Sequence, residues 1–392
     1  MNAPKLRFKE FNDEYKKVKL NTQCEFLNGL TYALNDIADE GITVLRSSNI
    51  QNSRIDYSDI VKVNINVTSK LKINENDILI CVRNGSKNLV GKTAWLSKKE
   101  ENCTWGAFMN VIRPNTSNKY IYYFLNGYSF HNHIWKDLGT ATVNQITKKT
   151  LDDCYINIPS IKEQNKISDF FSLLDKKIEL QSKKIEDLKL FKKGLLIKEF
   201  NNKKCSNKLK ECFDFGKAGG TPKSTNKDYY NGYIPFLSIS DMTTQGKYIY
   251  YTDKSITEAG LNNSTAWLVP KNSIIISMYA SYGLVSINKI DLTTSQAMFN
   301  MVINKNYVVE YIYYYLYYLY ISSFYNSIVS TGTQSNLNAE QIKLLDIYIP
   351  CYKEQKRIYE QFSKIDFKIN LEQIKFNELL YLKKGLMQNM FV

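Results

Sequence analysis

The chain of 392 residues contains only two histidines, His131 and His133, so histidine cannot supply a metal site anywhere else. The string His131-Asn132-His133 spells the name of a nuclease motif. That motif spreads its residues over a metal site, whereas neighbouring side chains on a helix diverge by about 100°. We interpret this pair as surface or half-buried helical residues and predict no metal ligands.

The seven cysteines include no Cys-x-x-Cys pair, which favours reduced thiols in a cytoplasmic protein. No apolar segment of the secretory kind opens the chain, so we expect no secretion signal. The Tyr-rich run 311–320 is too short and too phenolic to span a bilayer. These features predict a cytoplasmic protein without a membrane partner.

Motifs for catalysis are also missing. The segment 219–225 resembles a phosphate-binding loop, but Pro222 stands where that loop needs glycine before its lysine. No glycine-rich S-adenosylmethionine loop and no N-P-P-Y or D-P-P-Y methyltransferase motif occurs. The strings Glu354-Gln-Lys356 and Asp187-Leu-Lys189 resemble parts of a nuclease site, yet both lie in segments that we predict to be solvated helices. We therefore predict no catalytic residues and no cofactor in this chain.

The chain does contain an internal duplication. Tyr120–Leu125 recurs as Tyr311–Leu316, and two further segments recur at the same offset of 191 residues. Aligned without gaps, residues 159–200 and 350–391 are identical at 18 of 42 positions. A repeat this long is a duplicated domain, because the units of solenoid proteins span at most about 50 residues. Two similar units suit a partner that is itself nearly two-fold symmetric.

The net charge of +14 and the pI of about 9.1 make a polyanion a plausible partner. A lysine- and asparagine-rich proteome would give the same balance in a protein that binds no nucleic acid.

Each repeat has two parts. Short β-branched segments broken by Gly, Asn, Ser and Pro, together with Tyr-rich helical segments, predict a mixed α/β domain. A proline-free segment that follows Pro159 or Pro350 predicts a long helix. The predicted domains are residues 1–157 and 207–348, and the predicted helical segments are 158–206 and 349–392.

Apolar residues in the two helical segments recur at 3–4 spacing, which is typical of a coiled-coil seam. The predicted seam residues are Phe171, Leu174, Ile178 and Leu188 in the first helix, and Phe362, Ile365, Ile369 and Leu379 in the second. Because both series share one register, we predict that the helices pair with each other as an antiparallel coiled coil. The alternative is that each helix packs only on its own domain.

Both helical segments open with Ile-Pro-x-x-x-Glu-Gln, at 158–164 and 349–355, and end with Lys-Lys-Gly-Leu, at 192–195 and 383–386. These motifs resemble the conserved helical regions of type I restriction–modification specificity (S) subunits. The segments 44–50, 219–222 and 234–240 resemble parts of that family's target recognition domains. The likeness covers nearly the whole chain, and the order and duplication of the motifs make it specific.

The resemblance implies a DNA-binding subunit that does no chemistry itself. Each recognition domain would read one half of a split double-stranded DNA target. The paired helices would separate the halves and dock two methylation (M) subunits, which use S-adenosylmethionine. Restriction (R) subunits, which use ATP and Mg²⁺, would join the full complex.

Polar loops that follow predicted strands are the candidates for contacting bases, because base edges are read by Arg, Asn, Gln, Ser and Thr. The matched loops of the two repeats carry different side chains, as expected if the halves read different sequences. Ordinary polar turns would look the same. The candidates are Arg46, Ser47, Ser48, Asn49, Arg83, Asn84, Ser86, Asn144 and Gln145 in the first repeat, and Ser238, Ser240, Tyr279, Ser281, Tyr282, Thr333 and Gln334 in the second.

Two other functions are compatible with parts of this pattern. A nuclease acting alone would need a carboxylate–lysine or metal constellation, and the α/β segments offer none. A scaffold protein joined through its coiled coil would bind no DNA.

Overall fold

The computed structural model describes residues 3–138, 144–201, 203–205, 207–279, 281–329 and 336–391. The chain divides into two compact units. Unit 1 comprises Met1–Ser182 with Ile374–Val392, and unit 2 comprises Lys183–Gln373. Each unit therefore contains one repeat's α/β domain and parts of both long helices.

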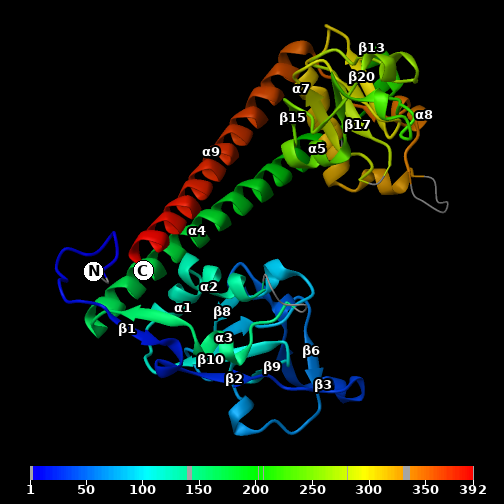
Figure 1. Cartoon of the computed structure of the whole chain (residues 1–392). Helices are drawn as coiled ribbons and strands as arrows, with labels where there is room; N and C mark the ends of the chain where they lie inside the picture. The colour runs from blue at the N-terminus through cyan, green and yellow to red at the C-terminus, as the bar shows by residue number, and fades with distance from the viewer. Residues whose placement is uncertain are drawn as a thin grey trace. The chain divides into compact units, whose positions relative to one another are not determined.

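Unit 1 is built from short strands and three short helices ahead of the first long helix (Figure 1). Its strands are β1 (Lys16–Lys19), β2 (Cys24–Asn28), β3 (Ile37–Leu45), β4 (Ile50–Gln51), β5 (Arg54–Ile55), β6 (Val61–Val63), β7 (Ile78–Cys81), β8 (Thr93–Trp95), β9 (Cys103–Trp105), β10 (Met109–Pro114) and β11 (Tyr155–Ile158). Its helices are α1 (Tyr120–Leu125), α2 (Tyr128–Leu138), α3 (Lys148–Asp152) and the start of α4 (Ile161–Phe200).

Unit 2 follows a similar order (Figure 1), but it has α5 and β15 where unit 1 has β4 and β5, α6 after β16, and a 3-10 helix at Phe324–Ser327 where unit 1 has α2. Its strands are β12 (Asn207–Lys208), β13 (Phe213–Ala218), β14 (Tyr230–Leu237), β15 (Tyr248–Ile249), β16 (Lys254–Ile256), β17 (Ile274–Ser277), β18 (Val285–Asn288), β19 (Thr293–Thr294), β20 (Met298–Ile303) and β21 (Asp346–Ile347). Its helices are α5 (Ile239–Gln245), α6 (Glu258–Asn262), α7 (Val309–Ile321), α8 (Ala339–Lys343) and the start of α9 (Tyr352–Met390).

The sheets of the two units share one topology. Unit 1 has the strand orders β2-β10-β7-β8 and β6-β3-β9, and unit 2 has β13-β20-β17-β18-β15 and β16-β14-β19. The larger sheets are antiparallel over their first four strands. In each smaller sheet one pair is parallel, β3 with β9 and β14 with β19. The structure confirms the predicted duplicated α/β fold.

The Tyr-rich segments form α1 and α7, which lie between the larger sheet of their unit and a long helix (Figure 1). These helical segments are predicted from the sequence, and all six residues of α1 are buried. The phenols need partners when buried. Tyr120 Oη donates to Asn157 O at 2.7 Å, and Tyr311 Oη donates to Tyr348 O at 2.5 Å.

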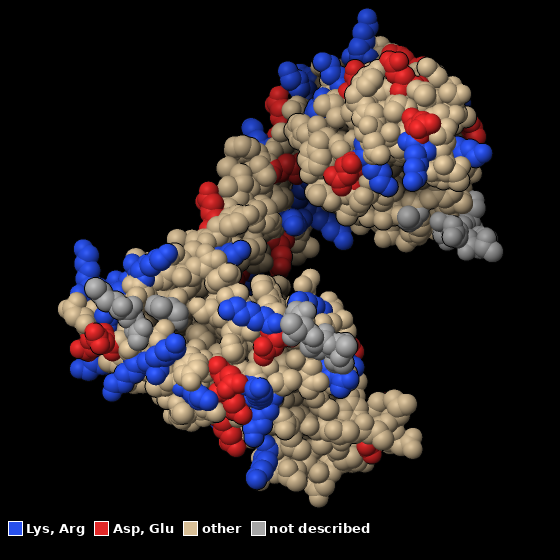
Figure 2. All heavy atoms as spheres, in the orientation of Figure 1, with Lys and Arg blue, Asp and Glu red and all other residues tan. Residues whose placement is uncertain are grey.

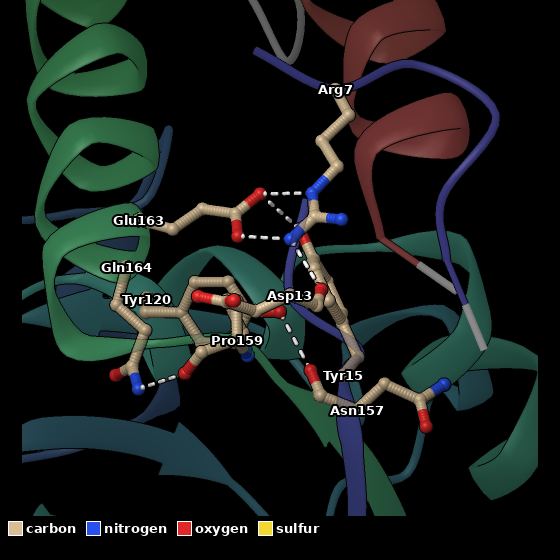
Figure 3. Close-up of polar contacts among 8 residues, drawn as sticks. All are labelled: Arg7, Asp13, Tyr15, Tyr120, Asn157, Pro159, Glu163 and Gln164. Atoms are coloured by element: carbon tan, nitrogen blue, oxygen red, sulfur yellow. Dashed lines mark hydrogen bonds and ion pairs between the residues drawn. The ribbon is translucent and has the colours of Figure 1, made fainter. Parts of the chain in front are cut away.

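The Ile-Pro-x-x-x-Glu-Gln motif shapes the start of each long helix. Gln164 Nε2 donates to Pro159 O at 3.0 Å, and Gln355 Nε2 donates to Pro350 O at 2.9 Å. In unit 1 the buried Glu163 carboxylate also forms a bidentate pair with Arg7, at 2.8 Å for each bond, and accepts from Tyr15 Oη at 2.9 Å (Figure 3). The glutamate thus ties the N-terminal segment to α4. In unit 2 the equivalent Glu354 carboxylate instead accepts from Arg357 of its own helix, at 2.8 and 2.7 Å, and Arg357 Nη2 also lies 3.6 Å from Glu199 of α4.

The long helices pack against each other inside each unit. In unit 1 the early α4 residues Phe171 and Leu174 share a core cluster with Leu386, Met387 and Met390 of late α9. In unit 2 the late α4 residues Leu196 and Phe200 share a cluster with Ile358 and Phe362 of early α9. This pairing is antiparallel, as predicted. Phe171 and Phe362 also contact Tyr123 and Tyr314 of their own domains. Each helix therefore packs on its own domain as well as on the other helix, and the alternative of packing only on its own domain is wrong.

A Tyr–Asp–Lys triad occurs once in each unit. In unit 1 Asp175 accepts from Tyr123 Oη at 3.0 Å and lies 2.5 Å from Lys383 Nζ. In unit 2 Asp366 accepts from Tyr314 Oη at 2.5 Å and lies 2.5 Å from Lys192 Nζ. Each triad joins a domain, the helix of its own repeat and the helix of the other repeat. All three residue types recur at an offset of 191, so the internal repeat of the sequence already contains the pattern of this triad.

Candidate nucleic-acid interface

Three polar segments that the sequence singles out in the first repeat meet at one edge of unit 1. Asn84 Nδ2 donates to Ser47 Oγ at 3.1 Å, and Asn144 Nδ2 donates to Gly85 O at 3.1 Å. The Asn84 amide also donates to Asn144 O at 3.3 Å. We call residues 46–49, 83–86, 108 and 144–145 the first edge.

The strand order explains why these segments meet. Strands β3 and β9 are parallel, so Leu45 and Trp105 end at the same side of the smaller sheet. The larger sheet contributes the residues after β7, where the amides of Val82 and Arg83 both donate to Phe108 O, at 3.0 and 3.2 Å. Ile146 N donates to Val82 O at 2.7 Å and brings in the third segment.

The two arginines of the first edge differ in their surroundings. Arg46 Nη2 lies 2.8 Å from an Asp59 carboxylate oxygen, and its buried Nε has no hydrogen-bond partner among the described residues. Arg83 is exposed, and its guanidinium carbon lies 5.1 Å from the centroid of the Phe108 ring. Within the described ranges, no hydrogen bond or ion pair engages the Arg83 guanidinium. Arg83 therefore keeps its donors available for a ligand.

Asn49 is only 1% exposed, and its side chain is used inside its own loop. Its oxygen accepts from Arg46 N at 2.8 Å, and its amide donates to Asp56 O and Asp59 O at 2.9 and 2.8 Å. A base contact by Asn49 would require these bonds to open, so in this structure Asn49 shapes the loop. Ser48, Ser86 and Gln145 are exposed, and Gln145 faces Arg83 through an isolated β-bridge.

The equivalent edge of unit 2 uses the same backbone frame. Ser238 N donates to Asp241 Oδ2 at 2.8 Å, as Arg46 N does to Asn49, and Asp241 is likewise buried. Ser238 Oγ also donates to Asp241 Oδ2 at 2.6 Å and lies 2.7 Å from Ser240 Oγ. A structural residue therefore stands at the same place in both loops, Asn49 in one and Asp241 in the other.

The second segment of this edge follows β17. Met278 N donates to Ala297 O at 2.8 Å, and Leu337 N donates to Met278 O at 2.9 Å, which repeats the bonds made by Val82. Tyr279 is 41% exposed, whereas Tyr282 Oη donates to Asn326 Oδ1 at 2.8 Å and Ser281 O accepts from Ser277 Oγ at 2.5 Å. Thr333 and Gln334 lie outside the described residues.

Two further side chains belong to these edges that the sequence did not single out. Phe108 is 56% exposed although its neighbours Met109 and Val111 are buried. Thr221 Oγ1 donates to Gln296 Oε1, a residue that follows β19. Phe108 precedes β10 by one residue, and the antiparallel pairing of β10 with β7 places it beside Arg83.

The predicted seam residues differ in how deeply they are buried. Phe171, Leu174 and Phe362 are buried, and Ile178, Leu188, Ile365, Ile369 and Leu379 are half-buried. Lys184 Nζ pairs with Glu372 at 2.9 Å where the apolar pattern is interrupted.

Charges are mixed rather than gathered on the face seen in Figure 2, where lysine and arginine lie among acidic and neutral residues. Across the described ranges, His, Cys, Asp and Glu form no group of three that could hold a metal ion. None of the described helices is long and apolar enough to cross a membrane.

The duplicated domain and its paired helices define a protein class that comparison with known proteins identifies. The family profile described as "Type I restriction modification DNA specificity domain" matches residues 12–190 and again 202–381. The chain belongs to this family of type I restriction–modification specificity subunits.

Individual relatives agree. The StySPI specificity subunit of Salmonella potsdam is 32% identical over 188 residues, which are 45% of this chain and 40% of that protein. The EcoKI specificity subunit of Escherichia coli K12 is 31% identical over 47% of this chain and 42% of its own length. The chain thus spans less than half the length of these relatives. The putative MjaX specificity subunit of Methanocaldococcus jannaschii is 25% identical over 98% of this chain and 95% of its own length.

Solved structures show the same fold. A chain from a type I R-M system superposes with a TM-score of 0.61 at 15% identity, covering 96% of this chain and 97% of that one. The S subunit from M. genitalium superposes with a TM-score of 0.55 at 17% identity, covering 100% and 99%.

Proposed function

We propose that this chain is the DNA-reading subunit of a type I restriction–modification complex, in which each edge reads one half of a bipartite double-stranded target. One observation carries this proposal. The edges share a backbone frame, bond for bond at Arg46 and Ser238 and at Val82 and Met278, but they present different side chains. A conserved frame with changed side chains is expected of two modules that read different sequences.

We propose further that the chain itself is non-catalytic and acts in the cytoplasm. S-adenosylmethionine would be held by M subunits, and ATP and Mg²⁺ would be used by R subunits. Support comes from the lack of catalytic motifs in the sequence and from the specificity-subunit names of the relatives.

Exposed apolar side chains on the long helices support docking of two M subunits. Three pairs of them recur at an offset of 191: Leu180 with Leu371, Leu190 with Tyr381, and Phe191 with Leu382. The exposed fractions of these six residues range from 39% to 76%. Apolar residues exposed next to each other mark partner surfaces, and their duplication suits two copies of one partner. Aspartate at Leu190 and Phe191 should remove one M subunit, and aspartate at Tyr381 and Leu382 the other, as counted by native mass spectrometry.

Genome-wide methylation mapping with and without this chain tests the function directly. We expect one bipartite motif that disappears when the chain is removed. Replacing residues 209–348 with those of another family member should change one half of the motif only. If both halves change, or if the purified chain with its M subunit binds DNA without sequence preference, the proposal is wrong.

A further inference from the structure

On the first edge the guanidinium carbon of Arg83 lies 5.1 Å from the centroid of the exposed Phe108 ring, and no other described residue forms a hydrogen bond or ion pair with that guanidinium. A guanidinium held over an aromatic face loses little freedom when it binds, because its plane is already fixed. The N–H donors of a guanidinium form a rigid fork that matches the O6 and N7 acceptors of guanine. Arg46 is unlike Arg83 in this respect, since Asp59 already occupies its guanidinium.

The loop under Arg83 is held on both sides. Asn84 bonds to Ser47 Oγ, and the Arg83 amide is fixed on Phe108 O. Phe108 itself is fixed by its backbone, because its carbonyl receives two amides from the adjacent segment. An arginine that lies over an aromatic ring on an anchored loop is preorganised for binding.

The residues at the equivalent position of unit 2 indicate whether Arg83 contacts a base or a phosphate. The bond from Met278 N to Ala297 O places Ala297 where Phe108 stands, and Tyr279 where Arg83 stands. Phosphates carry no sequence information, so a phosphate contact would be useful to both halves. A pair that is present in one half and absent from the other is expected of a residue that reads sequence.

We propose that Arg83, positioned by Phe108, reads a guanine in the half of the target bound by unit 1, with Phe108 acting as a specificity-determining residue. This inference rests on the proposed function and adds the base and the pair of side chains that recognise it.

The test uses the full chain in complex with its M subunit and duplexes that carry the mapped target. Binding is measured by fluorescence anisotropy for duplexes in which each guanine of the target is replaced by 7-deazaguanine, which lacks the N7 acceptor. For the unmodified protein, one guanine in the unit 1 half should be sensitive. Arg83→Ala should weaken binding to the intact duplex about 5- to 100-fold and should remove the sensitivity at that guanine alone.

Variants at Phe108 test the positioning. Phe108→Leu removes the ring but keeps an apolar side chain, and we expect it to lower discrimination at the same guanine. Phe108→Tyr keeps the ring and should restore discrimination. Tyr128→Leu is the matched control, because Tyr128 is an aromatic residue of unit 1 with a similar exposed fraction of 59%; it should leave discrimination unchanged.

Two outcomes would overturn the inference and leave the proposed function standing. Arg83→Ala could weaken binding equally for all DNA sequences and reduce the dependence of affinity on salt by the amount expected for about one lost phosphate contact. Arg83 would then contact the DNA backbone and not a base. Phe108→Leu could also leave the guanine preference intact. If the unmodified complex showed no sequence-specific binding at all, the proposed function itself would fail.

Discussion

Lys383 at the end of α9 lies 2.5 Å from Asp175 in α4, and Lys192 at the end of α4 lies 2.5 Å from Asp366 in α9. Each lysine is the counterpart of the other at an offset of 191, as is each aspartate. The Lys-Lys-Gly-Leu motif of one repeat thus serves the domain of the other repeat. Both pairs are largely shielded from water, with side-chain exposures between 13% and 29%.

Removing the aspartate should loosen each unit separately. Asp175→Ala leaves Lys383 and Tyr123 without their shared partner, so unit 1 should lose about 1–3 kcal/mol of unfolding free energy. Trp95, Trp105 and Trp135 lie in unit 1 and Trp267 lies in unit 2, so fluorescence of Trp267→Phe chains follows unit 1 alone during denaturation. Lys384→Ala, at an exposed neighbour of Lys383, is the control. Equal stability of Asp175→Ala and the control would refute the role of the triad.

The stability of unit 2 should depend on pH through Lys247. Burial lowers the pKa of Lys247 to about 8 from 10.5, although Asp366 and Glu310 act in the opposite direction and Lys192 adds to the lowering. Between about pH 8 and 10 the unfolded chain therefore binds more protons than the folded one, and unfolding free energy should rise with pH by at most about 1.4 kcal/mol per pH unit.

The trend should reverse at higher pH. Burial raises the pKa of Tyr248 and Tyr314, so above pH 10 the folded state retains protons that the unfolded state loses. Denaturant titrations from pH 7 to 11 would record both the rise and the fall, with Trp267 fluorescence followed in a chain whose other three tryptophans are replaced by phenylalanine. Lys247→Met should abolish most of the rise in unfolding free energy between about pH 8 and 10 and should keep the fall above pH 10. An unchanged rise would exclude Lys247 as its cause.

Two matched glycines should not tolerate a side chain. Gly91 and Gly283 have positive φ angles of 87° and 83°, and each amide bonds back across its turn, to Cys81 O and Ser277 O. An added Cβ would lie 2.6 Å from Ile134 Cδ1 at Gly91 and 2.3 Å from Tyr325 Cδ2 at Gly283. Alanine at either position should destabilise its unit by about 1–3 kcal/mol through strain and overpacking, and should therefore lower the melting temperature of that unit.

Gly194→Ala is a control that should have the opposite effect. Open space surrounds this helical glycine, so alanine should stabilise the protein by about 0.5–1 kcal/mol.

A chain ended after residue 206 should form a working homodimer. In unit 1 the Phe391 ring packs on Tyr120 and Phe171, at centroid distances of 5.2 and 5.9 Å. Phe200 is its counterpart and makes the matching contacts with Tyr311 and Phe362. A second copy can therefore supply Phe200 in place of Phe391, and the target should become an inverted repeat of one half-site. Light scattering would report the dimer and methylation mapping the site. A stable monomer that still directs methylation to the original asymmetric site would contradict this prediction.

Features that depend on local pattern could be predicted from the sequence. The duplication and the long helices that follow Pro159 and Pro350 rest on repeats, periodicity or composition over a short window. The polar loops were found for the same reason, because they follow apolar strands.

The details of the edges could not be predicted, because they depend on contacts between distant segments. In the sequence Asn49 looks like an exposed polar residue, but in the structure its side-chain amide donates to the carbonyls of Asp56 and Asp59. In the sequence Phe108 looks like a core residue of a strand, but in the structure the strand begins one position later, at Met109. The difference between Arg46 and Arg83 likewise depends on where Asp59 and Phe108 lie in space.

The division of the helices between the units has a consequence for biosynthesis. Unit 2 occupies one continuous stretch, residues 183–373, whereas unit 1 needs residues 374–392 to complete its core around Phe171. Domains fold as units while the ribosome proceeds from the N-terminus. The domain that is translated first is therefore the last to be completed, and until Met387, Met390 and Phe391 arrive it is the half of the nascent chain most exposed to proteases and chaperones.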